Sequence, residues 1–161
     1  MRRALAVALA VLLAGCGFHL RGQVELPFET LYVPGTNSLA VELRRNVVAA
    51  SNTKLVEAPK SAQAVLGFTT EARDKIILSF TSAGKVNEYR LRYRVGFRVT
   101  DPNGAQVFLP TSEILLTRDM TYNDAQVLAK QEEENLLYRD MQTDMVQQIM
   151  RRLGAARPTF E

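Results

Sequence analysis

Cysteine and histidine carry much of the nucleophilic and metal chemistry of proteins, and this chain holds one of each, Cys16 and His19. A thiolate is the strongest soft nucleophile among the side chains, so Cys16 can be alkylated. A single cysteine forms no intrachain disulfide, and a lone histidine cannot build a zinc site. Cys16 is therefore a candidate for covalent modification, and we expect neither a metal site nor a cofactor.

The residues around Cys16 place it at a processing site. Arg2 and Arg3 precede an apolar run, Ala4 to Leu13, that is too short to span a bilayer and is typical of a signal peptide. The run ends in Leu13-Ala14-Gly15-Cys16, which resembles the lipobox of bacterial lipoprotein precursors. We therefore predict that residues 1–15 are removed and that Cys16 becomes the lipid-modified N-terminus. The alternative is an ordinary signal peptide followed by a chance cysteine.

No set of residues indicates catalysis. His19 lies close to the predicted mature N-terminus, away from any Ser-His-Asp arrangement. The acidic residues of the last predicted helix are best explained as a solvated face, and no glycine-rich phosphate loop follows a strand. These are Glu132, Glu133, Glu134, Asp140 and Asp144. We predict a protein that is not an enzyme.

Four arginines recur at alternate positions on one predicted strand: Arg90, Arg92, Arg94 and Arg98. One reading is an open sheet face kept soluble, with cross-strand acids such as Glu113 or Asp119 beside the arginines. The other is recognition of phosphate or another anion by guanidinium groups. Nucleic acid, the usual partner of a basic sheet face, is excluded by the export signal.

The clearest pattern predicts the strand itself. Apolar residues at Tyr89, Leu91, Tyr93, Val95, Phe97 and Val99 alternate with polar ones, which buries one face. Other strands are expected at 30–33, at 64–70 with 76–80 as one bent strand or two, and at 106–109 with 113–122, interrupted at Pro110. Turns are expected at 82–85 and 101–104.

Two helices complete the predicted domain. The first starts at Asn37 or Ser38 and stops at Ser51-Asn52, where Asn tolerates a left-handed conformation. The second is capped by Asn123 or Asp124 and ended by Gly154. Its predicted apolar stripe comprises Ala125, Leu128, Ala129, Leu136, Leu137, Met141, Met145, Ile149 and Leu153.

This order of elements predicts an α+β fold, a two-layer sandwich in which two helices cover one face of a mostly antiparallel four-stranded sheet. We divide the chain into a signal peptide (1–15), a lipidated tether (16–28), one domain (29–155) and a tail (156–161). The chain has 20 basic and 17 acidic residues, and removing Arg2 and Arg3 leaves 18 basic ones, so the mature domain is nearly neutral.

Several segments resemble the LptE (RlpB) family of lipopolysaccharide-assembly lipoproteins. The most specific is the opening of the mature chain, Cys16-Gly17-Phe18-His19-Leu20-Arg21-Gly22. Less specific matches are Asn87-Glu88-Tyr89 before the alternating strand, the turn 101–104, and the last helix, with 125–130 at its start and 149–153 at its end. The similarity in element order covers essentially the whole mature chain.

The resemblance implies an outer-membrane location, which Gly17 in place of Asp also favours, with the protein lipid-anchored and facing the periplasm. It implies a complex with the β-barrel protein LptD, within whose lumen the protein acts as a plug, helps barrel assembly and takes part in delivering lipopolysaccharide to the outer leaflet. The alternative is a free outer-membrane lipoprotein that binds another envelope ligand without a barrel partner.

The resemblance also implies a lipopolysaccharide site near a hairpin tip and the start of the last helix. Lys130 matches a family lysine at that helix start. Some members carry an arginine at the position of Ser82, and Lys85 is the nearest substitute in this chain. We predict that Lys130 and Lys85, together with some of Arg90, Arg92 and Arg94, contact the phosphorylated head group of lipopolysaccharide.

Overall fold

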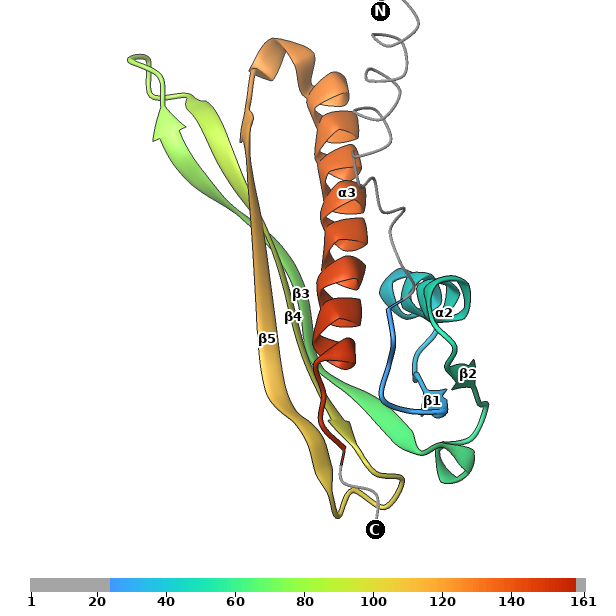
Figure 1. Ribbon diagram of the computed structural model, residues 1–161. Coiled ribbons are helices and arrows are strands. Elements are labelled where there is room, and N and C mark those ends of the chain that lie inside the picture. The colour runs from blue at the N-terminus through green and yellow to red at the C-terminus, as the bar shows by residue number, and fades with distance from the viewer. Residues whose placement is uncertain (1–23, 159–161) are drawn as a thin grey trace, which may run out of the picture.

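The computed structural model describes residues 24–158, so Cys16, His19 and the predicted signal peptide lie outside the described part of the chain. Three long antiparallel strands form most of the sheet: β3 (Ala64–Phe80), β4 (Val86–Thr100) and β5 (Val107–Thr121). They are joined by the two predicted turns, in which Gly84 and Gly104 adopt positive φ angles of 75° and 72°. Figure 1 shows the β3–β4 hairpin curving away from α3 toward its tip.

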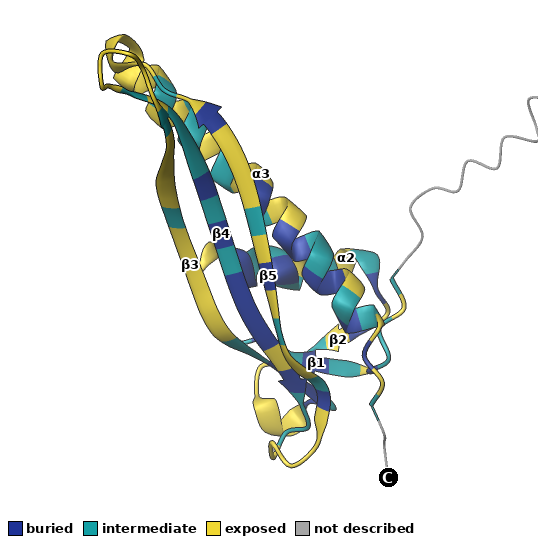
Figure 2. Ribbon diagram, turned by 90° about the vertical axis from the view of Figure 1, so that its left-hand side faces the viewer, coloured by how far each residue is buried: buried dark blue, intermediate teal, exposed yellow. Residues whose placement is uncertain are grey.

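The sheet has five strands and is mixed, which corrects the predicted four-stranded, mostly antiparallel sheet. β1 (Thr30–Tyr32) lies between β2 (Lys54–Leu55) and β3, giving the order β2-β1-β3-β4-β5. β1 runs parallel to both neighbours, with Leu31 opposite Leu55 on one side and Ala64 on the other. The two-layer α+β class is as predicted, because α2 and α3 both cover one face (Figure 2).

Two segments predicted to be interrupted are continuous strands. β3 passes through Arg73 and Asp74 without a break, and its irregularities lie on either side, between Phe68 and Thr70 and between Ile77 and Phe80. β5 likewise continues through Pro110, opposite a shift in register. A β-bulge absorbs an extra residue while the strand continues, so a bulge and a strand end look alike in sequence.

The first helix, α2 (Ser38–Ala50), begins as predicted, because the Asn37 side chain accepts a hydrogen bond of 3.2 Å from the Ala40 amide. It stops at Ser51, but not in a left-handed conformation. Ser51 is extended, with φ of −141°, and its hydroxyl donates to the Val47 carbonyl at 2.6 Å. No non-glycine residue within 24–158 has positive φ.

The second helix, α3 (Val127–Gly154), is preceded by a short 3₁₀ turn, η2 (Asp124–Gln126). Asn123 caps that turn by accepting from the Ala125 amide at 3.0 Å. Gly154 is the last helical residue and has no positive φ. A Cβ atom there would meet Val24 Cγ1 at 3.1 Å and the Glu25 carbonyl at 3.3 Å, so this glycine permits close approach of the N-terminal segment.

The core confirms the predicted face of β4. Leu91, Tyr93, Val95 and Phe97 are fully buried and face the helices. The predicted stripe of α3 is fully buried only in its second half, where Met141, Met145, Ile149 and Leu153 are buried together with Val146 and Met150, while Leu137 is partly buried against the core. In the first half, Leu136 is 51% exposed and Leu128 is 83% exposed, so the prediction that Leu136 packs against the sheet was wrong.

Residues 24–28, predicted as part of a tether, pack against the domain. The Val24 amide donates to the Ala50 carbonyl at 2.7 Å, and Phe28 is buried in the core. Its ring stacks on Phe108 of β5 with centroids 6.1 Å apart. The folded part of the chain therefore begins before residue 29.

Candidate functional site

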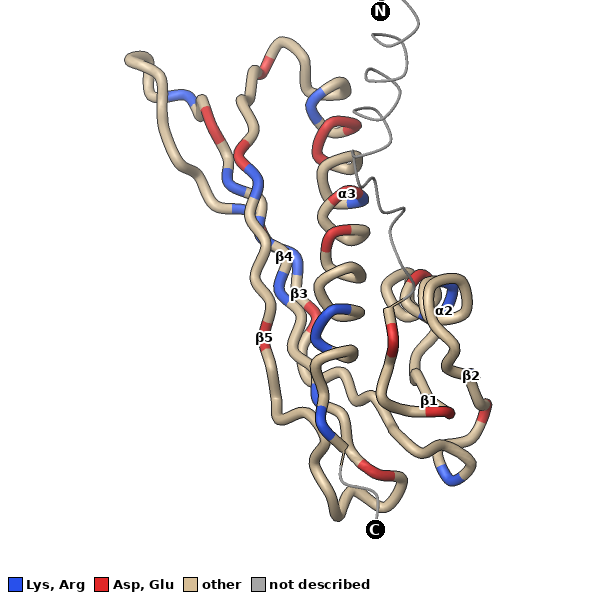
Figure 3. Tube along the Cα trace, viewed as in Figure 1, with Lys and Arg blue, Asp and Glu red and all other residues tan. Residues whose placement is uncertain are grey.

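The predicted lysines lie at one end of the molecule, where the β3–β4 tip faces the connection between β5 and α3 (Figures 1 and 3). Lys85, just after the tip, has its Nζ atom 3.2 Å from Asp124 Oδ2 in η2. A cavity of about 360 Å³ lies between these segments, lined by Lys85 and Asn87 on the hairpin and by Tyr122 and Asp124 opposite.

Lys130 lies one turn into α3 and is largely covered, with 14% of its side chain exposed. Its Nζ atom donates to Thr121 Oγ1 at 3.0 Å and to Glu133 Oε2 at 2.7 Å. Lys130 lines a smaller cavity of about 120 Å³ that also contains Tyr122. Because Tyr122 lines both cavities, the structure brings Lys85 and Lys130 to neighbouring parts of one site.

A third lysine, Lys75, lies at this site and was not predicted from the sequence. Lys75 lines the smaller cavity, forms a 2.7 Å ion pair with Glu134, and lies 5.0 Å from the centre of the Tyr89 ring. Lys75 is opposite Leu91 in the β3–β4 register, which places it on the helix-facing side of the sheet. The alternation of side chains along β3 could have identified Lys75, because its neighbours Asp74 and Ile76 lie on the opposite face of the sheet.

The arginines occupy the opposite face of the sheet from Lys75 and Lys130. Each of the three predicted ligand residues is paired with a carboxylate on a neighbouring strand. Arg90 bonds Asp119, Arg92 bonds Asp74, and Arg94 lies 3.7 Å from Glu113. Arg98 lies opposite Gly67 near the other end. The arrangement agrees with an open face whose charges are balanced across strands.

One ion pair on this face shifts the pKa of its carboxylate. The pKa of Asp119 is lowered below its ordinary value of 3.8, chiefly by the hydrogen bond from Arg90. On the helix-facing side, burial raises the pKa of Tyr93, whose hydroxyl donates to Glu71 Oε1 at 2.8 Å. No buried side-chain N or O atom in the described residues lacks a hydrogen-bond partner.

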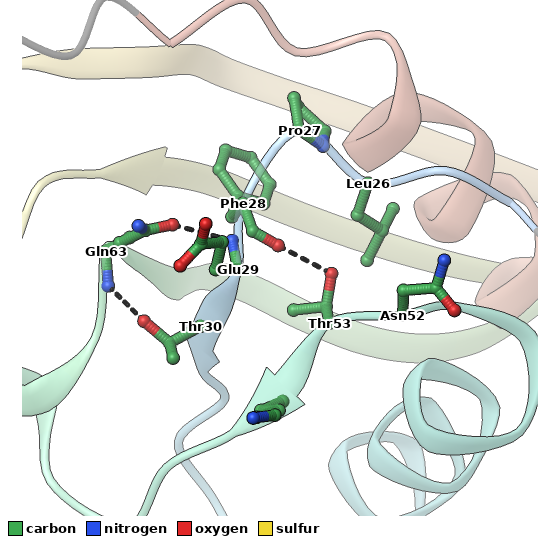
Figure 4. A pocket seen from close by; sticks show the side chains of 9 residues that line it. Leu26, Pro27, Phe28, Glu29, Thr30, Asn52, Thr53 and Gln63 are labelled. Carbon is green, nitrogen blue, oxygen red and sulfur yellow. Dashed lines mark hydrogen bonds between the residues drawn. The ribbon is translucent and has the colours of Figure 1, made fainter.

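A larger cavity of about 530 Å³ lies at the other end, where residues 26–30 meet β2 (Figure 4). Its polar groups are engaged within the fold. Thr53 Oγ1 donates to the Phe28 carbonyl at 2.8 Å, the Gln63 amide donates to Thr30 Oγ1 at 2.8 Å, and Gln63 Oε1 accepts from the Glu29 amide at 2.6 Å. These bonds hold β1 in place, and we assign this cavity a structural role.

Two features of residues 24–158 bear on the class of site. No group of three or more His, Cys, Asp or Glu side chains there could hold a metal ion. Within the same residues, no helix is both long and apolar enough to cross a membrane.

Comparison with known proteins gives one consistent result. The model of the LptE lipopolysaccharide-assembly family matches residues 28–153. Proteins named LPS-assembly lipoprotein LptE from Photorhabdus laumondii and Pectobacterium atrosepticum are each 30% identical, and each match covers 92% of this chain and 83% of the relative.

Solved structures agree. Lipoprotein B from Nitrosomonas europaea is 41% identical with a TM-score of 0.74, covering 86% of this chain and 91% of that one. Rare lipoprotein B from Shewanella oneidensis is 26% identical with a TM-score of 0.67, covering 78% and 94%. From the family match over residues 28–153 and these relatives, we conclude that the chain belongs to the LptE family of lipopolysaccharide-assembly lipoproteins.

Proposed function

We propose that this protein is a lipid-anchored outer-membrane lipoprotein that occupies the lumen of an LptD β-barrel as a plug, assists assembly of that barrel, and helps deliver lipopolysaccharide to the outer leaflet. Membership of the family and relatives named for lipopolysaccharide assembly support the general role. The barrel, the lumen and the anchor are the finer part of the proposal.

The observation that carries the plug role is the charge pairing on the open sheet face. Arg90, Arg92 and Arg94 are each matched by an acid on β3 or β5, so this face is polar without a large net charge. The lumen of a wide outer-membrane barrel is also polar and wet. Such a face can enter it without burying unpaired charge, which would be costly.

We further propose that the end formed by the β3–β4 tip and the start of α3 binds the phosphorylated head group of lipopolysaccharide. Lys85 in the larger of the two cavities at this end and Lys130 in the smaller one supply the main contacts, and Lys75 is a third cation beside Lys130 in the smaller cavity. Each lysine is held by one carboxylate in the free domain, and a phosphate would exchange with it. Arg90, Arg92 and Arg94 lie on the other face of the sheet and are paired with carboxylates. They would contact the phosphate only after releasing those partners.

The anchor is proposed at Cys16, outside the described residues. We expect Cys16→Ala to abolish acylation and to leave uncleaved or misprocessed precursor. Mass spectrometry of the mature protein decides this, because an unmodified N-terminus at another residue would exclude the lipobox.

Co-purification tests the barrel. An affinity-tagged chain extracted from outer membrane in detergent should bring down one large β-barrel in about 1:1 amount, as expected for a permanent complex. Recovery of the lipoprotein alone from cells in which the barrel is abundant would instead indicate a free lipoprotein with another envelope ligand.

A further inference from the structure

β3 has a long edge that no strand within residues 24–158 covers. On one side it pairs with β4 along nearly its whole length. On the other side, β1 pairs only with Ala64 and Val65, so the edge from Leu66 to Phe80 has no neighbouring strand. Such an edge presents a row of backbone N–H and C=O groups that can pair with another chain.

The far part of this edge is apolar and exposed. Ile76, Ile77, Leu78 and Phe80 are 39%, 45%, 38% and 60% exposed. Residues 76–84 contain no charged side chain and no proline. A segment with high β-propensity and low charge on a free edge is an aggregation hazard when nothing covers it.

The charged residues that precede this run do not guard the edge, because each is held within the domain. Glu71 accepts from Tyr93, Arg73 donates to Gln142 on α3, and Lys75 pairs with Glu134. Asp74 is held by Arg92, and its backbone carbonyl accepts from the Tyr138 hydroxyl at 2.9 Å. α3 therefore closes the edge at Asp74 and leaves it open beyond Lys75.

The edge of the sheet formed by β5 is partly protected. β5 carries Pro110, which cannot donate to an added strand, and the Glu113 carbonyl accepts from Arg152 on α3 at 3.1 Å. Beyond Glu113, β5 also has no outer neighbour within the described residues, but it carries Arg118 and Asp119. Ile76–Phe80 has register shifts between Ile77 and Phe80 but neither proline nor charge, and this contrast marks it as the edge segment better suited to pairing.

The exposed side chains show what kind of partner fits. Ile76 lies opposite Arg90 on the open face, whereas Ile77 lies opposite Tyr89 on the helix-facing side. A flat partner would cover one of these faces and leave the other in water. An added strand covers both, because its side chains alternate in step with those of the edge.

We propose that Ile76–Phe80 of β3 pairs with an extended strand donated by the barrel partner, from a segment that folds into the lumen. This inference rests on the proposed function. The wall strands of a closed barrel have no free edge, so the donor must be a loop or terminal segment. The uncharged run favours a donor that is apolar along its length, because the nearest lysines, Lys75 and Lys85, already pair with Glu134 and Asp124. In the proposed 1:1 complex the lumen holds one lipoprotein, so the barrel itself is the source of the strand.

Hydrogen exchange tests the backbone pairing directly. We would compare the full lipoprotein in detergent, alone and in its co-purified complex, by mass spectrometry. Peptides covering residues 76–80 should exchange about tenfold more slowly in the complex, because amides of a paired strand are protected. Peptides covering 112–121 of β5 serve as the internal comparison and should change little.

Substitution gives an independent measurement. Leu78→Lys with Phe80→Lys places charge on the edge, and Val48→Lys, at an exposed apolar position on α2, is the matched control. The double variant should fold, as judged by circular dichroism, and recover about tenfold less barrel than the control.

Unchanged exchange at 76–80 in a complex that does co-purify would overturn the edge pairing and leave the plug role standing. Absence of any barrel with the wild-type chain would overturn the plug role and the donor together. Concentration-dependent protection of the lipoprotein alone would assign the edge to a second copy and overturn the barrel donor.

Discussion

Arg90 and Asp119 face each other across β4 and β5 and form a two-pronged ion pair, with Arg90 Nε 2.7 Å from Oδ1 and Nη2 2.8 Å from Oδ2 of the carboxylate. The planar guanidinium matches the carboxylate in a way that lysine cannot. Because both side chains remain accessible, solvent and salt limit what the pair contributes to stability.

The pKa of Asp119 should respond to this pair. It is lowered from 3.8, so the stabilisation by the pair is present above about that pH and is lost as pH falls through the lowered value. In Arg90→Gln the pKa of Asp119 should return toward 3.8, measured by NMR titration. Asp101 is the control, because backbone hydrogen bonds, first that from Gln106, lower its pKa. Equal movement of both carboxylates would contradict the assignment.

Phe97 and Arg98 test the alternation of β4 at adjacent positions. Phe97 is fully buried and Arg98 is exposed. Phe97→Ala should lower the free energy of unfolding by about 3–5 kcal/mol, through lost transfer energy and the cavity left behind. Arg98→Ala should lower it by about 0.5 kcal/mol or less. Urea denaturation measures both, and similar small losses would show that β4 does not bury the assigned face.

Gly96 should be required by the neighbouring bulge of β3. A Cβ atom on Gly96 would lie 2.5 Å from Thr69 Oγ1, inside contact distance. Gly96→Ala should therefore destabilise the domain by about 1–3 kcal/mol, as overpacked sites do. In a Thr69→Ala background the same change should cost much less. A double-mutant cycle measures this coupling, and strictly additive effects would rule out the steric explanation.

Lys85→Gln combined with Lys130→Gln should weaken lipopolysaccharide binding by the purified lipoprotein, and the remaining binding should depend less on salt. The control is Lys54→Gln with Lys60→Gln, which removes equal charge at the β1–β2 end of the sheet. Barrel co-purification should be unchanged in both. If binding stays at the wild-type level, the lysines are not the ligand site, and loss of the barrel would assign them to the protein interface.

Local sequence patterns explain which parts of the fold could be predicted. The alternation through β4 and the turns at Gly84 and Gly104 are local signals, and all were correct. β2 has only Lys54 and Leu55, too short for any period, and its partner β1 lies earlier in the chain. A parallel pairing of this kind leaves no turn motif, so the fifth strand could not be predicted.

The misassigned stripe of α3 has a similar cause. A helical period shows which residues share a face but not where a neighbouring layer ends. In its second half α3 also packs against α2, where Gln147 bonds Asn46 and Thr143 bonds Glu42, and this contact adds Val146 and Met150 to the buried set. No part of α2 packs against the first half of α3. There Leu136 is exposed to solvent and Leu137 is partly buried.

The candidate site could be predicted only in part, because it depends on contacts between segments that are distant in the sequence. Lys85 and Lys130 were chosen by family resemblance, and their closeness depends on how the β3–β4 tip meets the start of α3. Of the acids that hold them, Asp124 was predicted only as a candidate helix cap and Glu133 only as part of a solvated face. The arginines agree with the first of the two alternatives, an open sheet face with cross-strand acids, because the register of β4 and β5 places Asp119 beside Arg90.

The position of β1 between two strands that follow it in the chain sets an order of events during folding. Among the described strands it alone has both neighbours later in the chain, β2 at Lys54–Leu55 and β3 from Ala64. A chain that emerges N-terminus first therefore presents Leu31 before either partner strand is available. The β3–β4–β5 meander closes through short turns and should form quickly, since local contacts cost little loop entropy. We therefore expect insertion of β1 between its neighbours to be a late step that follows formation of the meander.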